Sequence, residues 1–331
     1  MTATSTPAVA AAPGPRRGLR LRGTAWTVWR AHRSALLVWC AYVLAMAGWL
    51  LWLRIVTLHE IDQEAASCGD SDPCIDVLAA MTYSSDLSMI GTLVSYLCYG
   101  VAAWAGAALT GRELERGTAQ LAWTQSVTPT RWLAAKLAVP AVVLVLGTTA
   151  LVLLYRWAWA ADRGMVGDEW FYPDPMVNRG PLLVAYALCA LAVGALAGLA
   201  LRRALPALAV ALGFMAWFHV FLDQHTRQLW PTTTLTDTAA SRVPENADQI
   251  ALGSITDSGA RVSDLSCFND DGASADAVRA CMANHEFTGL YAEVHPPSHF
   301  WPLHLMATGV VLAVTVLATA AAFRLLRRRT R

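Results

Sequence analysis

The sequence predicts an all-α polytopic membrane protein with six transmembrane helices. Of its 331 residues, 56% are hydrophobic and 15% are charged, whereas about a quarter of the residues in an average soluble protein are charged. A membrane-spanning helix needs roughly 20 consecutive, mostly apolar residues, and six stretches reach this length. The predicted spans are residues 34–58, 87–110, 133–154, 181–201, 205–222 and 301–323.

The distribution of charge predicts the orientation of these spans. Six spans place both termini on one side of the membrane. If that side is the cytosol, it carries 17 of the 25 basic residues but only 2 of the 24 acidic ones, Glu113 and Glu115. Cytosolic loops of membrane proteins are enriched in Arg and Lys. We therefore expect cytosolic N and C termini and a strongly acidic outer face.

Two short tails flank the six-helix domain, which we assign to residues 19–323. Residues 1–18 are basic and rich in Pro and Ala, a composition typical of a disordered segment. Residues 324–331 are mostly arginine and predict a basic cytosolic tail.

The loop between the second and third spans, GRELERGTAQLAWTQSVTPTRW, holds both cytosolic carboxylates. In a helix, Glu113 and Glu115 would each lie near an arginine three positions away, Arg116 and Arg112. The Gly117-Thr118 pair then predicts a break and a new N-cap. A solvated juxtamembrane helix without a special role is the alternative that spacing alone leaves open.

The third span is expected to begin directly after this loop. Thr128-Pro129 is typical of an N-cap followed by a proline in the first helical turn. Arg131, Trp132 and Lys136 follow, and basic and aromatic side chains are common at the membrane interface.

The second span carries a set of small and aromatic residues. They could line a route for a lipid-like or drug-like substrate, but helix packing is the favoured interpretation. The residues are Gly91, Ser95, Tyr96, Tyr99, Gly100 and Trp104. In the fourth span, Gly194 and Gly198 have the four-residue spacing that permits close helix approach.

The segment before the sixth span, residues 223–300, is predicted to lie outside the cell. At 78 residues it is too long to be structureless throughout, and Ser274–Asn284 predicts a short helix with Ser274 as its N-cap.

Four cysteines, Cys68, Cys74, Cys267 and Cys281, are predicted to lie outside the cell, where disulfides persist. Short loops close most easily, which favours Cys68–Cys74 and Cys267–Cys281. A link between the two outer segments is the alternative.

Several kinds of chemistry are not expected. The acidic residues of the outer segments lack the spacing of a calcium loop, and prolines interrupt the stretch with His295, His299 and His304, so we predict no metal site. A phosphate-binding loop needs a glycine-rich run that ends in Gly-Lys-Ser/Thr, whereas the single lysine, Lys136, follows two alanines. We predict no catalytic residues, no cofactor and no nucleic-acid partner.

The loop sequence Glu-Leu-Glu-Arg-Gly-Thr, followed by Thr-Pro-Thr-Arg-Trp-Leu-Ala-Ala-Lys, resembles a known signature. It is similar to the E-x-E-x-G-T … P-x-S/T-R … K pattern between the second and third spans of exporter-type ATP-binding-cassette permeases, the ABC-2 type. The stretch Ala122–Val127 and the 24 arginines against one lysine resemble a subgroup from high-GC bacteria.

The resemblance implies that this loop is a coupling helix, which sits in a groove of a separate ATPase subunit. The contact positions are then Glu113, Glu115, Gly117 and Thr118, followed by the basic positions Arg131 and Lys136. The chain itself would be no enzyme but a multi-pass permease subunit in the cell membrane.

Six spans make half of a pore, so the resemblance also implies a homo- or heterodimer within the lipid bilayer. The long outer segment departs from the family's commoner short hairpin and is expected to cap the exit of the pathway. The alternative is a membrane sensor or accessory protein whose outer segment binds a ligand or partner.

Overall fold

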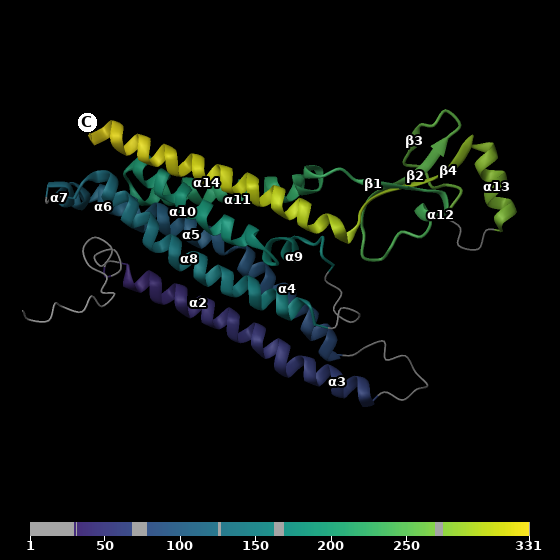
Figure 1. Cartoon of the computed structure of the whole chain (residues 1–331), viewed down its shortest axis with the longest axis horizontal. Coiled ribbons are helices and arrows are strands. Elements are labelled where there is room, and N and C mark those ends of the chain that lie inside the picture. The colour runs from purple at the N-terminus through teal and green to yellow at the C-terminus, as the bar shows by residue number, and fades with distance from the viewer. Residues whose placement is uncertain are drawn as a thin grey trace, which may run out of the picture.

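The computed structural model describes residues 30, 32–67, 78–124, 127–161, 169–268 and 274–330. Within these residues, six helices are long and apolar enough to cross a membrane, and each overlaps one of the six predicted spans. The continuous helical segments are Arg33–Glu64, Leu78–Glu115, Pro129–Trp159, Pro181–Leu201, Ala204–Leu229 and Pro297–Thr330. They form one elongated bundle (Figure 1).

Two of these segments contain π-helical turns. In the first, α2 (Arg33–Trp52) continues through the turn Leu53–Thr57 into α3 (Leu58–Ser67). In the second, α4 (Leu78–Ser95) and α5 (Leu97–Trp104) lead through the turn Ala105–Gly111 into α6 (Arg112–Glu115). The remaining bundle helices are α7 (Thr118–Thr124), α8 (Pro129–Trp159), α9 (Pro173–Asn178), α10 (Pro181–Leu201), α11 (Ala204–His225) and α14 (Phe300–Thr330).

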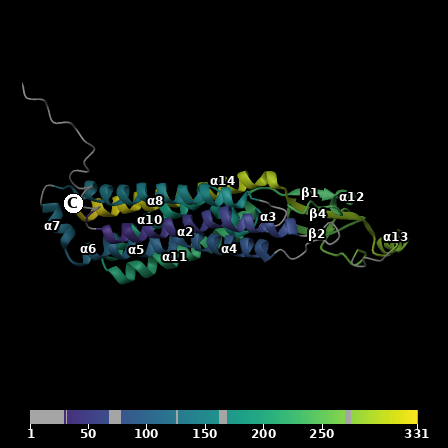
Figure 2. The same ribbon diagram turned by 90° about the horizontal axis from the view of Figure 1, so that it is seen from below.

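The bundle has two distinct ends. α6, α7, the start of α2 and the C terminus lie at one end, which we call the α6–α7 end (Figures 1 and 2). A small domain of strands extends the molecule beyond the other end, which we call the sheet end. The start of the first span and the end of the last one thus share a side, as an even number of spans requires.

Helix α10 forms the centre of the bundle. Most of its residues are buried, and it packs on α14, α8, α11 and α5. A Cβ atom built on Gly194 would lie 2.6 Å from the Cβ of Ala105, and one on Gly198 would lie 2.8 Å from the amide nitrogen of Gly111. The two glycines therefore allow α10 to approach the π-helical turn closely, which confirms the packing role predicted for them.

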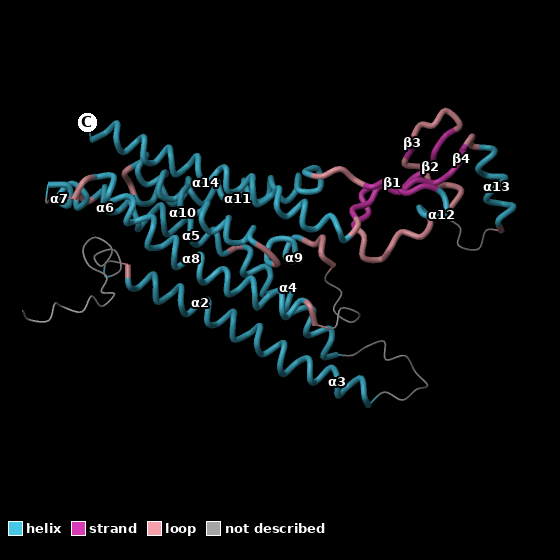
Figure 3. Tube along the Cα trace, in the orientation of Figure 1, coloured by secondary structure: helices cyan, strands magenta, loops and turns pink. Residues whose placement is uncertain are grey.

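The sheet domain, residues 233–295, corrects the all-α prediction. It holds an antiparallel sheet in the order β1-β4-β2-β3 (Figure 3). The strands are β1 (Thr233–Thr236), β2 (Asp248–Thr256), β3 (Arg261–Val262) and β4 (Phe287–His295). α12 (Asp237–Ala240) and α13 (Ala275–Asn284) accompany them. A separate small core forms from Ala240, Ala247, Ala292 and Val294.

Two local predictions within the chain are confirmed. Ser274 caps α13, and its hydroxyl accepts a hydrogen bond of 3.2 Å from the amide of Ala277. Thr128 caps α8 by accepting from the amide of Arg131 at 3.4 Å, with Pro129 as the first helical residue.

The C-terminal segment differs from the predicted tail. α14 continues to Thr330, so most of residues 324–331 belongs to a helix. The guanidinium of Arg329 donates to the carbonyl oxygens of Leu199 and Ala200, at 2.5 and 3.2 Å. The predicted N-terminal tail, residues 1–18, lies outside the described residues.

Candidate functional site

The loop at the α6–α7 end is helical and broken where the sequence predicted. α6 ends at Glu115 and α7 begins at Thr118. Between them Gly117 has φ +72°, a left-handed conformation that glycine adopts without steric cost. The hydroxyl of Thr118 donates to the carbonyl oxygen of Glu113 at 3.2 Å. Thr118 thus bonds back to α6 rather than serving as the predicted N-cap.

Lys136 lies at the centre of a buried polar network. It is on α8, is 3% exposed, and its Nζ donates to Oε1 of Glu113 at 2.5 Å. The same nitrogen donates to the carbonyl oxygen of Leu109 at 3.0 Å and lies 3.5 Å from Nε2 of His32. An ammonium group has three donors, and each has a partner here. We call these four residues the Lys136 network.

His32 completes the network as a neutral acceptor. It precedes α2, is 9% exposed, and its ring meets that of Trp104 edge-on at 5.5 Å. Burial, and then the nearby Lys136 ammonium, lower the pKa of His32 to about 4. The ring is therefore uncharged at neutral pH and has one nitrogen free of a proton. The network joins the start of α2, the end of the second span, and α8.

Glu115 joins the loop to a further helix. Its Oε2 accepts a hydrogen bond of 2.9 Å from the amide of Ala204, the first residue of α11. A carboxylate is favourable at a helix N-terminus because free amides point outward there. Both loop carboxylates thus bond to other helices, and not to the neighbouring arginines that the sequence suggested.

The outer face of the loop remains accessible. Leu121 on α7 is 61% exposed, and Arg116 and Gln120 are exposed beside it. Trp123 turns the other way and packs edge-on against Trp132 at 5.7 Å. An exposed leucine at the tip of a polar loop is available for a partner surface.

The six residues that the resemblance singled out therefore differ in burial and in bonding. Lys136 is buried, Glu113, Glu115 and Thr118 bond within the protein, Gly117 forms the turn, and Arg131 is exposed at the start of α8. Sequence reasoning missed His32 and the amide of Ala204 as partners, because nothing in the spacing connects them to the loop.

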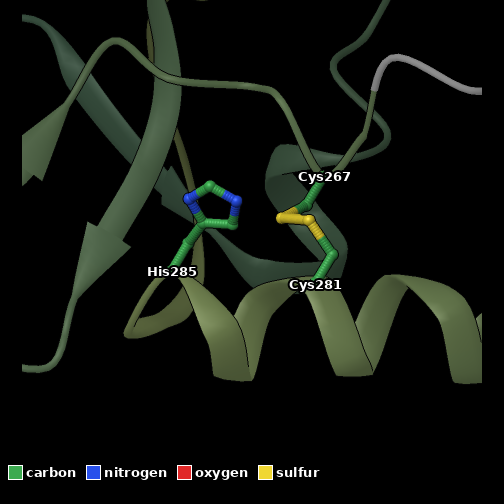
Figure 4. A group of neighbouring side chains, drawn as sticks. All are labelled: Cys267, Cys281 and His285. Carbon is green, nitrogen blue, oxygen red and sulfur yellow. A yellow bond between two sulfur atoms is a disulfide. The ribbon is translucent and has the colours of Figure 1, made fainter.

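The sheet end carries the predicted disulfide between Cys267 and Cys281 (Figure 4). The imidazole of His285 faces it, and one potential ligand atom from each of the three residues lies within 4.8 Å of the others. Sulfur atoms bonded to each other do not provide the thiolates that bind metals, so this oxidised group is no metal site. Cys68 and Cys74 lie outside the described residues.

The sheet domain meets the bundle through a small polar junction. Nε of Arg227 lies 2.9 Å from Oδ2 of Asp248, which is 4% exposed. Nε2 of His295 lies 3.0 Å from the carbonyl oxygen of Arg227. Trp170 donates from its indole nitrogen to the carbonyl oxygen of Asn246 at 2.8 Å. Burial raises the pKa of Asp248, although the Arg227 guanidinium opposes this.

These features define a multi-pass membrane protein with a helical loop at one end whose carboxylates bond to two other helices, α8 and α11. Residues 40–227, more than half of the chain, match the family described as ABC-2 membrane transporter related, and the chain belongs to this family. It is therefore a membrane permease component of the ABC-2 type. The match includes α6 and α7 and ends before the sheet domain. No curated protein matches the chain.

Proposed function

We propose that this chain is the transmembrane subunit of an ATP-driven exporter, with α6 and α7 as the coupling helices received by a separate ATPase. Two such permeases, identical or related, form the pathway. The α6–α7 end faces the cytosol and the sheet domain lies outside. The excess of basic residues toward the α6–α7 end supports this orientation.

The bonding of the loop carboxylates is the observation that carries the proposal. A loop that receives motion from a partner must pass it to the spans, and rigid elements transmit small shifts best. Glu113 transmits this motion to α8 and to the start of α2 through the Lys136 network, and Glu115 transmits it to α11. Lys136 in this scheme acts through Glu113, because an almost fully buried ammonium cannot reach the ATPase.

The surface that meets the ATPase is the exposed side of α7 and the turn before it. Leu121 is the apolar anchor, and Arg116 and Arg131 supply charge at its margin. A few central, well-buried side chains usually dominate the affinity of an interface.

The experiment compares two leucines that are both exposed in the isolated chain. Leu121→Ala is expected to weaken association with the co-expressed ATPase by about tenfold or more, and to reduce stimulated ATP hydrolysis in proportion. The matched control is Leu205→Ala on α11, since Leu205 is 78% exposed near the same end. It should leave both quantities unchanged.

Equal ATPase binding by wild type and Leu121→Ala would overturn the assignment of α7. A chain that binds no ATPase at all would favour the other candidate, a membrane sensor, for which the separately folded sheet domain offers a recognition module.

A further inference from the structure

A cavity opens between α2, α5 and α8, on the side of the bundle away from α14. Its volume is about 860 Å³, within the range of roughly 300–1,000 Å³ that is usual for ligand pockets. Trp39 and Tyr42 of α2 face it, as do Tyr96 and Trp104 of the second span. The exposure and the charge of its lining residues indicate which class of ligand would fit it.

The cavity opens sideways, toward the hydrocarbon region of a membrane. Val38 and Tyr96 both line it, and they are 70% and 52% exposed. Gly100 also lines it, and a Cβ atom at this position would meet nothing within 4 Å. Of the small and aromatic residues predicted to pack in the second span, Tyr96, Gly100 and Trp104 thus border open space.

Backbone irregularities form two of its walls. The π-helical turn Ala105–Gly111 contributes Ala108, and α8 contributes Pro140. A π-helical turn displaces the helix that follows it and is frequent at functional sites, and an internal proline removes one backbone hydrogen bond and bends the helix. The opening is consequently built into the backbone of two spans.

The polar groups of the cavity gather at its α6–α7 end. They belong to His32, Ser34, Arg112 and Glu113, whereas the rest of the wall is largely apolar. The Glu113 carboxylate is already neutralised by the buried Lys136, and His32 is uncharged for the reason given above. Among the described residues that line the cavity, the exposed Arg112 guanidinium is the charge left without a counter-charge, so the cavity is apolar along its length and cationic at its α6–α7 end.

We propose that this cavity binds one acyl chain of an anionic phospholipid, with the phosphate of the head group at Arg112 and Ser34. Arginine binds phosphate through two parallel hydrogen bonds. An apolar cleft that opens to the bilayer can accept an acyl chain directly from the hydrocarbon region, so the chain does not pass through water. In the proposed orientation the charged end of the cavity lies in the cytosolic leaflet, which holds anionic lipids. Lipid binding here requires no ATPase, so its failure would leave the proposed function intact.

The test uses the full chain in lipid nanodiscs that contain phosphatidylglycerol with a photoactivatable acyl chain. After illumination, labelled peptides are identified by mass spectrometry. Label is expected on α2 and on α5 where they face the cavity. Gly100→Leu fills the space and should reduce this label by about tenfold. Ala108→Leu provides a second filling variant.

The matched control is Gly309→Leu on α14. A Cβ atom at Gly309 also meets nothing within 4 Å, and the residue is exposed on a helix that does not line the cavity. It should be labelled like the wild type. Equal labelling of α2 and α5 in the wild type and in both filling variants would overturn the site.

The head group is tested by exchanging phosphatidylglycerol for phosphatidylcholine of the same acyl chain. The anionic lipid should label the wild type more strongly, and Arg112→Gln should remove that preference while Arg116→Gln retains it. Equal labelling by both lipids in the wild type would overturn the anionic specificity.

Discussion

At the α6–α7 end, the charged side chains of a loop are bonded into the bundle, whereas at the sheet end a whole domain is attached through a few polar contacts. Glu113 reaches a lysine on another helix and Glu115 reaches the first amide of a third. The sheet domain has its own core and its own disulfide, and Asp248 forms an ion pair with Arg227, which lies in the turn Thr226–Leu229 directly after α11.

The difference indicates how each end responds to change. α6 cannot shift without moving the helices to which its carboxylates are bonded, so damage there should spread through the bundle. The sheet domain is stabilised internally, so damage there should remain local. Four measurements test this contrast.

The largest effect is expected when the ion pair at the α6–α7 end is broken. Glu113→Leu leaves the Lys136 ammonium buried without a counter-charge, which typically costs about 3–5 kcal/mol. The thermal unfolding midpoint of the whole bundle in detergent should therefore fall sharply. In the double variant Glu113→Leu/Lys136→Leu no buried charge remains, so much of the loss should be recovered.

Arg116→Leu is the control for that experiment, since Arg116 is exposed on the same loop. If Glu113→Leu were no more damaging than this control, the network would not stabilise the bundle.

The second effect concerns the disulfide of the sheet domain. Cys267 and Cys281 are 14 residues apart, and closing a loop of this size stabilises a folded unit by about 3 kcal/mol. Cys267→Ser/Cys281→Ser should make α13 and β4 susceptible to limited proteolysis while the bundle keeps its unfolding midpoint. Cys40→Ser, at an exposed free cysteine on α2, should change neither. Loss of bundle stability in the double serine variant would contradict the independence of the domain.

A smaller effect is expected at Glu115. Glu115→Ala removes the acceptor for the amide of Ala204 and should cost about 1 kcal/mol, as is usual for the loss of a helix cap. Glu115→Gln keeps an acceptor oxygen and should retain most of the stability. Hydrogen exchange at the first turn of α11 measures both, and identical protection in wild type and Glu115→Ala would show that the contact is not made.

The smallest effect is a dependence on pH at the junction. Because burial raises the pKa of Asp248 in the folded domain, its protonated form is favoured on folding. Its contribution to stability is present at low pH and is lost as the pH rises through the raised pKa. Lowering the pH from neutral toward this raised pKa should thus slow proteolysis of the sheet domain in the wild type more than in Asp248→Asn. Equal pH responses would rule out this contribution.

The sequence predicts the bundle well because span length and charge asymmetry are properties of contiguous residues. It also predicts where α8 and α13 begin, because Thr128 and Ser274 cap the first turns of these helices through local hydrogen bonds. The sheet was missed because β4, one of its two inner strands, lacks a strict alternation of polar and apolar residues in its sequence FTGLYAEVH. Parts of both faces of this strand are buried.

The loop partners were not predictable for a different reason. Glu113 and Lys136 are 23 residues apart and on different helices, so only the packing of α8 against the second span brings them together. The α11 amide that Glu115 accepts from is 89 residues away. The resemblance predicted both carboxylates as contact positions, but no spacing rule could state what they bond to.

The central position of α10 also sets an order of assembly during synthesis. This helix is apolar on all sides, yet the helix that covers much of it, α14, ends about 130 residues later, on the order of 10 s at ordinary rates of translation. The carbonyl oxygens of Leu199 and Ala200 near the end of α10 also gain their hydrogen bonds from Arg329 only after α14 has been made. A nascent chain that stops before α14 therefore exposes its most buried span to lipid or chaperone, and the bundle closes only after α14 has been synthesised.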